Sequence, residues 1–349
     1  MKNTLLRTLL PLALFSGLSG AGATAAETSY HLLKEIPVGG DGGWDYLTMD
    51  SAAHRLYLSH GNVVMVVDTQ KDAVVGQIDD TPGVHGLAIA PKLNRGFSSN
   101  GRENKVNIVD LATLKTVSKV DVGQNPDWIF FEAGQNEVYT FNGRSHNSSV
   151  LAADSGKVLA TIELGGKPET AMADASLGRV FDNIEDKNEV VAIDTKTHTV
   201  VNRWSIAPNA AASGMAIDLA HKRLILGCGD SNTMALLDYT SGKVTASVPI
   251  GAGVDACSFD SATQLAFSSC GGSGTVTIAH EDSPSKLTVV QTLTTERGAR
   301  TMTLDPATHR IYLASAKYLA ATASAAGGAK GRPQMVPGSF KVLVYGTDK

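Results

Sequence analysis

Residues 46–79 read YLTMDSAAHRLYLSHGNVVMVVDTQKDAVVGQID, and this stretch decides the fold. It holds four short runs rich in β-branched and aromatic residues, namely YLTMD, RLYLS, VVMVVD and AVVGQID, and turn residues separate them. Runs of this kind predict short β-strands, whereas the 3.6-residue periodicity of an amphipathic helix is missing. The stretch therefore predicts one unit of four consecutive strands.

The same unit recurs along the rest of the chain. One landmark is an aromatic or aliphatic residue after a basic or polar turn, and its copies are 40, 42, 42, 44, 42 and 45 residues apart: Tyr57, Phe97, Tyr139, Phe181, Ile225, Phe267 and Tyr312. A second landmark is an acidic residue that closes a β-branched run: Asp68, Asp110, Asp154, Asp194 and Asp238. Seven four-stranded units predict an all-β, seven-bladed β-propeller, because each sheet buries both faces only by packing between two neighbours.

The two ends of the chain predict how the ring closes. The last copy offers three clear strands, TMTLD, RIYLAS and FKVLVY, while a spare strand at residues 31–38 precedes the first copy. We expect this N-terminal strand to pair beside residues 340–345 as the outer strand of the last blade. Residues 26–349 then form a single propeller, interrupted by an Ala/Gly/Pro-rich insertion at 316–338.

The N-terminus predicts export. Lys2 and Arg7 precede an apolar run at residues 9–18, and small residues follow, so residues 1–25 are interpreted as a signal peptide. No later apolar run is long enough to insert into a membrane, so we expect a periplasmic or secreted protein. Removing Lys2 and Arg7 takes the net charge from −4 to −6, which disfavours broad binding to nucleic acid or anionic membranes.

The chain has three cysteines, Cys228, Cys257 and Cys270. An odd number in an oxidising compartment leaves at least one of them unpaired. Since Cys228 and Cys270 occupy equivalent places in neighbouring repeats, we expect buried strand residues and assign no disulfide.

A family resemblance rests on the turns between the strands. Val-Asp is followed by a turn such as residues 154–157 or 238–243, then by Val and Gly, and then by a proline such as Pro126 or Pro168. This pattern resembles the YVTN or YncE-like β-propeller family over the whole mature chain. The resemblance implies a seven-bladed, usually exported propeller, and a DNA-binding activity is attached to one branch of that family. It implies no shared reaction.

One residue per blade stands just before each innermost strand, where ligands usually meet a propeller at its axis. Aligned in this way, the seven blades present Asp45, His85, Asp127, Glu169, Ser213, Asp255 and Arg300. Converging carboxylates raise one another's pKa values or recruit a cation. This ring is therefore the candidate ligand site, and two arrangements would relieve its charge.

In the first arrangement, Arg300 lies between Asp255 and Asp45 in the closed ring, pairs with both, and water fills the channel. In the second, four ring residues bind a divalent metal, or orient a substrate as general acid and base: Asp45, His85, Asp127 and Glu169. Oxygen ligands with a single imidazole favour Ca²⁺, Mg²⁺ or Mn²⁺. Without such a metal we expect no cofactor.

Polar residues in the loops between second and third strands should form the rim of the same mouth: His60, Asn100, Arg102, Asn142, Arg144, His146, Asn183 and Glu185. Asn-Gly-Arg occurs at both 100–102 and 142–144, either as a tight hairpin turn or to hold an anionic group through the arginines. The 316–338 insertion should lie over the mouth, as a spacer or a lid. His280-Glu281-Asp282 falls in a turn that should open on the opposite face.

We therefore expect a binding scaffold for a small molecule, a metal ion or a protein partner at the axial mouth. The alternative is a metal-assisted hydrolase, lactonase or lyase at the same place. A second alternative, single-stranded DNA binding, requires a basic groove with stacking aromatics. Trp44 and Trp128 could stack bases, but the neighbouring carboxylates would repel phosphates. The ligand and the oligomeric state stay open.

Overall fold

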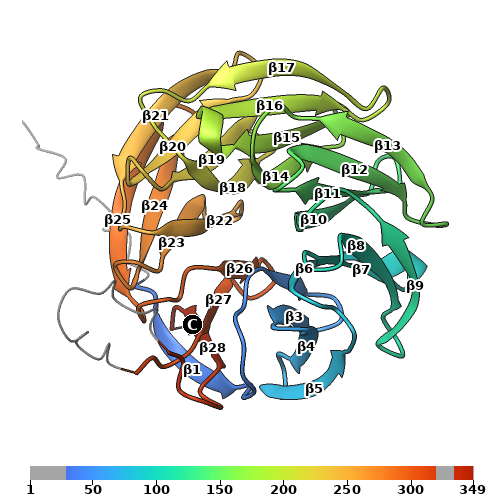
Figure 1. Ribbon diagram of the computed structural model, residues 1–349. Coiled ribbons are helices and arrows are strands. Elements are labelled where there is room, and N and C mark those ends of the chain that lie inside the picture. Colours follow the sequence, from blue (N-terminus) through green and yellow to red (C-terminus); the bar gives the residue numbers. More distant parts are fainter. Residues whose placement is uncertain (1–28, 320–333, 349) are drawn as a thin grey trace, which may run out of the picture.

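The computed structural model describes residues 29–319 and 334–348 as seven four-stranded antiparallel sheets arranged in a ring (Figure 1). The predicted seven-bladed β-propeller is therefore confirmed. The predicted signal peptide lies outside the described residues, as do residues 320–333 of the predicted insertion. No helix in the described part of the chain is long and apolar enough to cross a membrane.

The innermost strands are β2 (Leu47–Asp50), β6 (Val84–Ala90), β10 (Pro126–Glu132), β14 (Pro168–Asp174), β18 (Ala212–Asp218), β22 (Val254–Asp260) and β26 (Met302–Asp305). The second strands are β3 (Arg55–His60), β7 (Arg95–Asn100), β11 (Glu137–Asn142), β15 (Arg179–Ile184), β19 (Arg223–Cys228), β23 (Leu265–Cys270) and β27 (Arg310–Ser315). The third strands are β4 (Val63–Asp68), β8 (Lys105–Asp110), β12 (Asn147–Ala152), β16 (Glu189–Asp194), β20 (Thr233–Asp238), β24 (Thr275–Ser283) and β28 (Lys341–Gly346). The outer strands are β5 (Ala73–Ile78), β9 (Lys115–Asp121), β13 (Val158–Glu163), β17 (Thr199–Ser205), β21 (Lys243–Pro249), β25 (Lys286–Thr294) and β1 (His31–Pro37). Two short 3₁₀ helices, η1 (Pro91–Leu93) and η2 (Glu185–Lys187), complete the elements.

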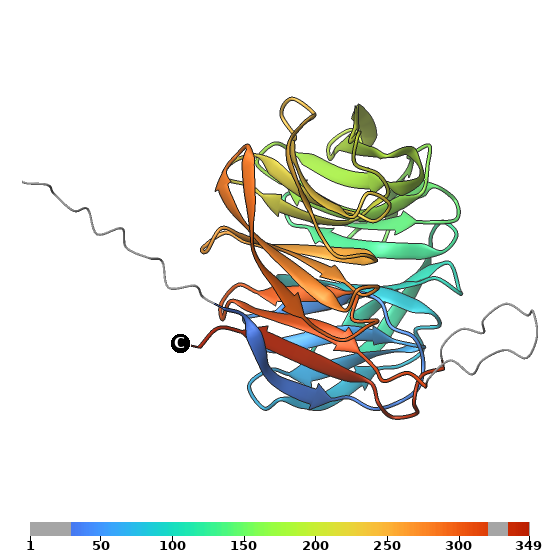
Figure 2. The ribbon, with the colours of Figure 1, turned by 90° about the vertical axis from the view of Figure 1, so that its left-hand side faces the viewer.

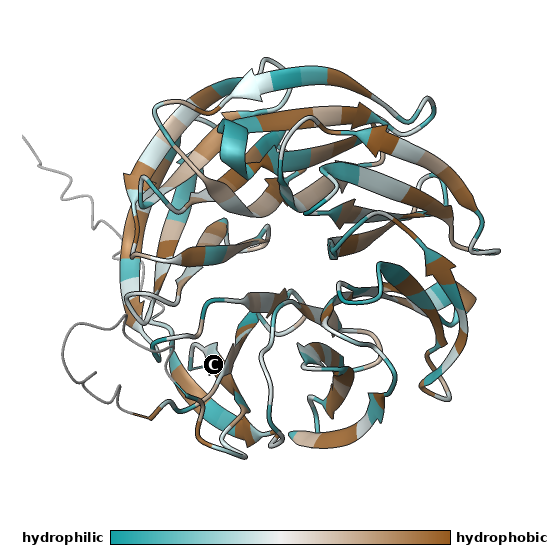
Figure 3. Cartoon of the chain, viewed as in Figure 1, coloured by the Kyte–Doolittle hydropathy of each residue, from teal (hydrophilic) through white to brown (hydrophobic). Residues whose placement is uncertain are grey.

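The core lies between the blades. All seven first-landmark residues are on second strands and are at most 2% exposed: Tyr57, Phe97, Tyr139, Phe181, Ile225, Phe267 and Tyr312. Tyr312 of the last blade, for example, packs in one cluster with Leu56 of the first. The outer strands mix polar and apolar residues, as the hydropathy colouring shows (Figure 3), and are mostly exposed. This is the pattern of sheets that are buried inside the ring and solvated at its edge.

The acidic second landmark closes third strands and orders the turns that follow. Asp194 Oδ1, for example, accepts backbone N–H groups of Lys196 and Thr197, both at 2.9 Å. This Asx-type turn explains why an acid recurs there. Asp154 differs, because β12 ends at Ala152 and leaves Asp154 exposed beyond it.

The ring closes as predicted. Strand β1 pairs antiparallel with β28, from His31 opposite Gly346 to Pro37 opposite Lys341 (Figure 2). Ile36 of β1 is fully buried against the last blade. The N-terminal strand therefore covers an edge that would otherwise expose unpaired backbone groups.

The three cysteines are free and buried, as expected: Cys228, Cys257 and Cys270. Burial raises the pKa values of all three thiols, that of Cys270 to about 11. Thiols held protonated in this way are poor nucleophiles and poor metal ligands.

Candidate functional site

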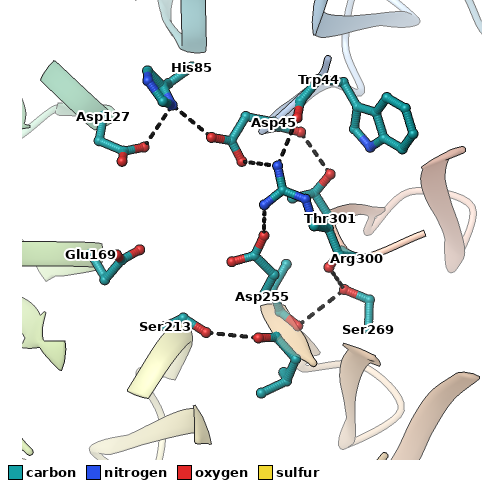
Figure 4. Close-up of polar contacts among 12 residues, drawn as sticks. Trp44, Asp45, His85, Asp127, Glu169, Ser213, Asp255, Ser269, Arg300 and Thr301 are labelled. Carbon is teal, nitrogen blue, oxygen red and sulfur yellow. Dashed lines mark hydrogen bonds and ion pairs between the residues drawn. The ribbon is translucent and has the colours of Figure 1, made fainter. Parts of the chain in front are cut away.

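A β-bulge at the start of the innermost strand presents the axial residues. In five blades the pairing between first and second strands shifts at this point, and the residues left without a partner in the register include His85, Asp127, Glu169, Ser213 and Asp255. A bulge turns a side chain out of the regular alternation of a strand. Asp45 and Arg300 precede the shorter strands β2 and β26. All seven surround the axis in Figure 4.

Serines on second strands hold the backbone of this ring. Ser59 accepts a hydrogen bond from the backbone N–H of Asp45 at 2.8 Å, and Ser99 donates to the carbonyl oxygen of Asp127 at 2.6 Å. Ser269 likewise donates to the carbonyl oxygen of Arg300. Ser99 and Ser269 each reach the next blade, so the spacing between ring residues is fixed by neighbouring sheets.

Arg300 neutralises one side of the ring. Its guanidinium is hydrogen-bonded to Asp255, lies 3.5 Å from Asp45 Oδ1, and donates to the carbonyl oxygen of Trp44 at 2.8 Å. Burial raises the pKa of Asp255 to about 6 even though Arg300 opposes the shift. The last blade is thus tied to the first through an ion pair as well as through β1, as the closed ring predicts.

His85 neutralises the adjacent side. Its Nδ1 lies 2.7 Å from Asp45 Oδ2 and 3.2 Å from Asp127 Oδ1. Burial disfavours the charged ring, but hydrogen bonds to Asp127 and Asp45 outweigh it and raise the pKa of His85 to about 10. At neutral pH the imidazole is therefore a cation shared by two carboxylates.

The third side holds a group that the ring alignment missed. Lys167 Nζ lies 2.6 Å from Glu169 Oε1 and 2.5 Å from Glu185 Oε2. Burial and the charge of Asp127 nevertheless raise the pKa of Glu169 to about 8. Asp182 of β15 is fully buried with no hydrogen-bond partner for its carboxyl within the described residues, and burial raises its pKa strongly, with Glu169 adding to the shift.

A signal for Lys167 and Asp182 was present in the sequence. Lys167 and Glu169 flank Pro168 at the start of an innermost strand, and an acid stands inside the apolar run RVFDNI of the next strand. A charged residue within a buried strand marks a polar site, because burial of an unpaired charge is costly.

The axial residues other than His85 line a cavity of about 300 Å³. Its lining includes two bases, Lys167 and Arg300, and six carboxyl groups: Asp45, Asp127, Glu169, Glu185, Asp230 and Asp255. Even with His85 counted as a third cation, the acids outnumber the bases. The cavity is therefore an acidic site with room for roughly ten water molecules, at about 30 Å³ for each.

Three of the four proposed metal ligands converge. One potential ligand atom from each of Asp45, His85 and Asp127 lies within 4.8 Å of the others. Glu169 stands apart from this group and is paired with Lys167 instead. The fourth ligand of a metal bound there would thus come from solvent or from a bound molecule.

The rim residues have several roles. Asn100, Asn142 and Asn183 are fully buried, and their amides donate to oxygens inside the blades or, from Asn183, to the next blade. His60 is also buried and stacks on Phe340 with 4.1 Å between ring centres. These four residues are buried in the protein and do not face solvent.

The remaining rim candidates lie nearer solvent. Glu185 is the partner of Lys167, and Arg102, Arg144 and His146 are exposed. Arg102 reaches Asn62 Oδ1 at 3.4 Å and lies along Gly83. That the arginines of the two Asn-Gly-Arg motifs hold an anionic group stays a prediction.

The Asn-Gly pairs are not the expected two-residue turns. The left-handed residues of these hairpins are Asn104, with φ of 56°, and His146, also with φ of 56°. Gly101 serves another purpose, because a Cβ at that position would lie 2.8 Å from His85 Nε2. The glycine makes room for the axial imidazole.

Of the two tryptophans near the axis, Trp44 is buried and Trp128 is partly buried. Trp44 is 8% exposed and its ring centre lies 5.2 Å from that of Phe340. Trp128 donates to the carbonyl oxygen of Ala171 at 2.9 Å and packs edge-on against Tyr46. The Trp44 ring is therefore not free to stack on a nucleic-acid base, whereas the Trp128 ring stays partly accessible.

The described ends of the 316–338 insertion lie beside the axial site. Tyr318 pairs with Met335 through an isolated β-bridge, and its ring centre lies 6.3 Å from that of Trp44. Tyr318 also contacts the Gly298 position in the loop that carries Arg300. The expectation of a lid or a spacer concerns residues that lie mostly outside the described ranges.

The fold and cavity define the class of protein, a seven-bladed β-propeller with an acidic axial site. Many solved structures share this fold, and two of them illustrate the likeness. A chain of hydrazine synthase from Kuenenia stuttgartiensis has 16% identity and a TM-score of 0.67, over 79% of this chain and 94% of that one. A chain of the mitotic checkpoint complex has 12% identity and a TM-score of 0.75, over 99% of this chain and 100% of that one.

At these identities the likeness concerns the fold alone. No protein-family model and no curated protein sequence matches the chain. The resemblance to the YVTN or YncE-like family therefore stays an expectation, while the seven-bladed fold that it implies is established.

Proposed function

We propose that this protein is a binding scaffold whose axial cavity takes a small organic cation, such as an amine. The observation that carries the proposal is the cavity itself, with six carboxyl groups against Lys167 and Arg300. A positively charged ligand gains from this imbalance, whereas an anion is repelled. Its volume of about 300 Å³ is at the lower end for small-molecule sites.

The protonation of Glu169 supports the same proposal. Its pKa of about 8 leaves the carboxyl largely neutral at pH 7, because burial, and after it the negative charge of Asp127, disfavours the carboxylate form. An ammonium group in the cavity would favour the carboxylate form. Cation binding should therefore release a proton near neutral pH.

A divalent metal ion is the second candidate, favoured by the convergence of Asp45, His85 and Asp127. His85 already supplies a positive charge to both acids, so a metal must displace its Nδ1 proton to bind there. This competition predicts weak binding at neutral pH that strengthens as the pH rises toward 10. A metal-assisted hydrolase, lactonase or lyase would depend on this binding.

Thermal-shift and calorimetric titrations with 1,4-diaminobutane, its neutral analogue 1,4-butanediol, and Ca²⁺, Mg²⁺, Mn²⁺ and Zn²⁺ test both candidates. The diamine should stabilise the folded wild type by about 2.7 kcal/mol when its concentration is 100 times its Kd. The diol should not stabilise it. Asp127→Asn should weaken binding of diamine and metal alike. Asp154→Asn removes the same charge at an exposed turn and serves as the matched control.

A flat response to the diamine would refute the organic-cation proposal. Stabilisation by an ion that survives Asp127→Asn would place that metal elsewhere. A flat response to all four ions from about pH 7 to 9 would refute the axial metal site, and with it the metal-assisted reactions.

A further inference from the structure

A second cluster of ionisable side chains lies at the other end of the innermost strands. Ser213 lies at the axial mouth as the second residue of β18, and Asp218 ends this strand about 17 Å away at 3.3 Å per residue. There Asp218 meets His221 of the turn after β18 and Glu281 of β24, in the next blade. One potential ligand atom from each of the three lies within 4.8 Å of the others. Glu281 belongs to the His280-Glu281-Asp282 motif, which lies within β24 and not in the predicted turn, and which the axial site leaves unused.

The contacts within the cluster leave one carboxyl without a partner. His221 Nδ1 lies 2.5 Å from Asp218 Oδ2 and 3.8 Å from Glu281 Oε1. The side chain of Glu281 is fully buried, and neither of its oxygens has a hydrogen-bond partner within the described residues. Two buried acids therefore share one imidazole, which lies close enough to satisfy only Asp218.

Equivalent positions in neighbouring blades are satisfied. Asp174, which ends β14, pairs with Lys222 at 2.8 Å and accepts a hydrogen bond from Tyr239 at 2.9 Å. Asp260, which ends β22, lies 2.6 Å from His309 Nδ1. In both neighbouring blades one acid thus has its own base, whereas the Asp218 cluster adds a second acid, Glu281, without a second base.

The nearby arginine does not fill this gap. Arg223 is held at 3.2 Å from Asp238 Oδ1 and donates to the carbonyl oxygens of Pro284 at 2.6 Å and His221 at 2.9 Å. Glu281 is thus fully buried close to Asp218 with no base of its own in the described structure. A bound cation would relieve this cost, because buried charges require a partner or a metal.

We propose that Asp218, His221 and Glu281 form a binding site for a borderline divalent cation, with Zn²⁺ as the best match, between the fifth and sixth blades. One imidazole nitrogen and two carboxylate oxygens suit zinc, whose ligands at about 2.0–2.2 Å from the ion lie about 3.3 Å apart in a tetrahedron. The observed separations of 2.5 and 3.8 Å bracket this value. The side chain of His221 is 40% exposed, so an ion can enter from solvent, and water completes the coordination.

Binding would exchange protons for the metal at defined atoms. The ion takes the place of the proton between His221 Nδ1 and Asp218, and of any proton on Glu281. The separation of His221 Nδ1 from Asp218 Oδ2 must widen from 2.5 Å to about 3.3 Å, the spacing of two ligands on one tetrahedral zinc ion. The two carboxyl groups are fixed by β18 and β24, so the site is largely formed before the ion arrives.

Titration of the tag-free, chelator-stripped protein with Zn²⁺ by calorimetry, and with Co²⁺ by visible absorption, tests the proposal. Wild type should bind one ion at this site. His221→Ala and Glu281→Gln should each lower the Zn²⁺ affinity by at least about tenfold. Loss of a residue that only orients a metal ligand already lowers metal affinity by about tenfold to a hundredfold. Asp127→Asn should leave this binding unchanged, which separates the site from the axial cavity.

His309→Ala is the matched control, because His309 makes the equivalent pair with Asp260 and is similarly exposed, at 42%. It should leave Zn²⁺ affinity unchanged. No bound ion in wild type, or equal affinity in wild type, His221→Ala and Glu281→Gln, would overturn the proposal. Glu281→Gln nearly preserves size and shape, so it keeps the test decisive if His221→Ala fails to fold.

Discussion

Replacing Arg300 with alanine should destabilise the propeller, because Arg300 compensates two carboxylates and joins the last blade to the first. The change removes the ion pairs with Asp255 and Asp45 and the hydrogen bond to the carbonyl oxygen of Trp44. The Asp45 and Asp255 side chains are only 16% and 20% exposed, so water cannot fully replace the guanidinium.

The size of the effect follows from these exposures. Breaking a buried pair costs about 3–5 kcal/mol, and an exposed pair contributes about 0–1 kcal/mol. Arg300 itself is 42% exposed, which places the expected loss between these limits, at about 2 kcal/mol. In a chain of this size that loss lowers the melting temperature by on the order of 4 °C.

Urea unfolding followed by tryptophan fluorescence, with calorimetry in parallel, measures the loss. Arg297→Ala is the control, because Arg297 lies exposed in the same loop and forms no ion pair in the described part of the chain. Without the guanidinium the pKa values of Asp255 and Asp45 rise further, so the defect should be larger at pH 8 than at pH 5. A loss equal to that of Arg297→Ala, or one independent of pH, would refute the reasoning.

Three further predictions concern the ring and its closure. Deleting residues 29–38 should lower the melting temperature sharply and cause aggregation, because Ile36 is fully buried and β28 loses its partner; unchanged melting and monodisperse chromatography would contradict the closure. Gly101→Ala should destabilise by about 1–3 kcal/mol by pushing His85 aside, whereas in Gly143→Ala the nearest atom lies 3.5 Å away and urea unfolding should stay near wild type. The pKa of His85 in the folded protein, about 10, exceeds its ordinary value of 6.5, so its contribution to stability is complete below pH 6.5 and is lost as the pH rises toward 10. Urea midpoints between pH 6.5 and 10 should therefore fall less steeply for His85→Asn than for wild type. Parallel slopes would exclude a stabilising charge on His85.

The sequence was sufficient to predict the blades because every copy repeats the same local physics. A residue such as Phe97 or Tyr312 recurs in phase because each blade must bury one side chain there against its neighbour. The spare strand followed from counting, since a closed ring leaves no edge unpaired. Patterns that repeat seven times reveal a fold even where no single copy would.

The pairing of the axial residues was less accessible. Aligning the innermost strands identified the seven ring positions, but Glu169 lies apart from the Asp45–His85–Asp127 group because Lys167, two residues before it, holds it. Which carboxyl group pairs with which base at the axis depends on distances between side chains of different blades, which are 40 or more residues apart in sequence. The Asn-Gly motif misled for a related reason, since Gly101 is required by the close approach of His85 and not by its own turn.

The two ends of the innermost strands differ in how their acids are compensated, and this difference predicts which end takes a metal. At the axis, Arg300, His85 and Lys167 already lie against the carboxylates, so a metal must displace a bound cation or proton there. At the opposite end, His221 alone serves Asp218 and Glu281, and the Glu281 carboxyl has no partner in the described structure. A divalent ion therefore gains more at the opposite end at neutral pH, while the roomier axial cavity favours an organic cation. The two ligands should consequently bind independently, each abolished by variants at its own end of the strands.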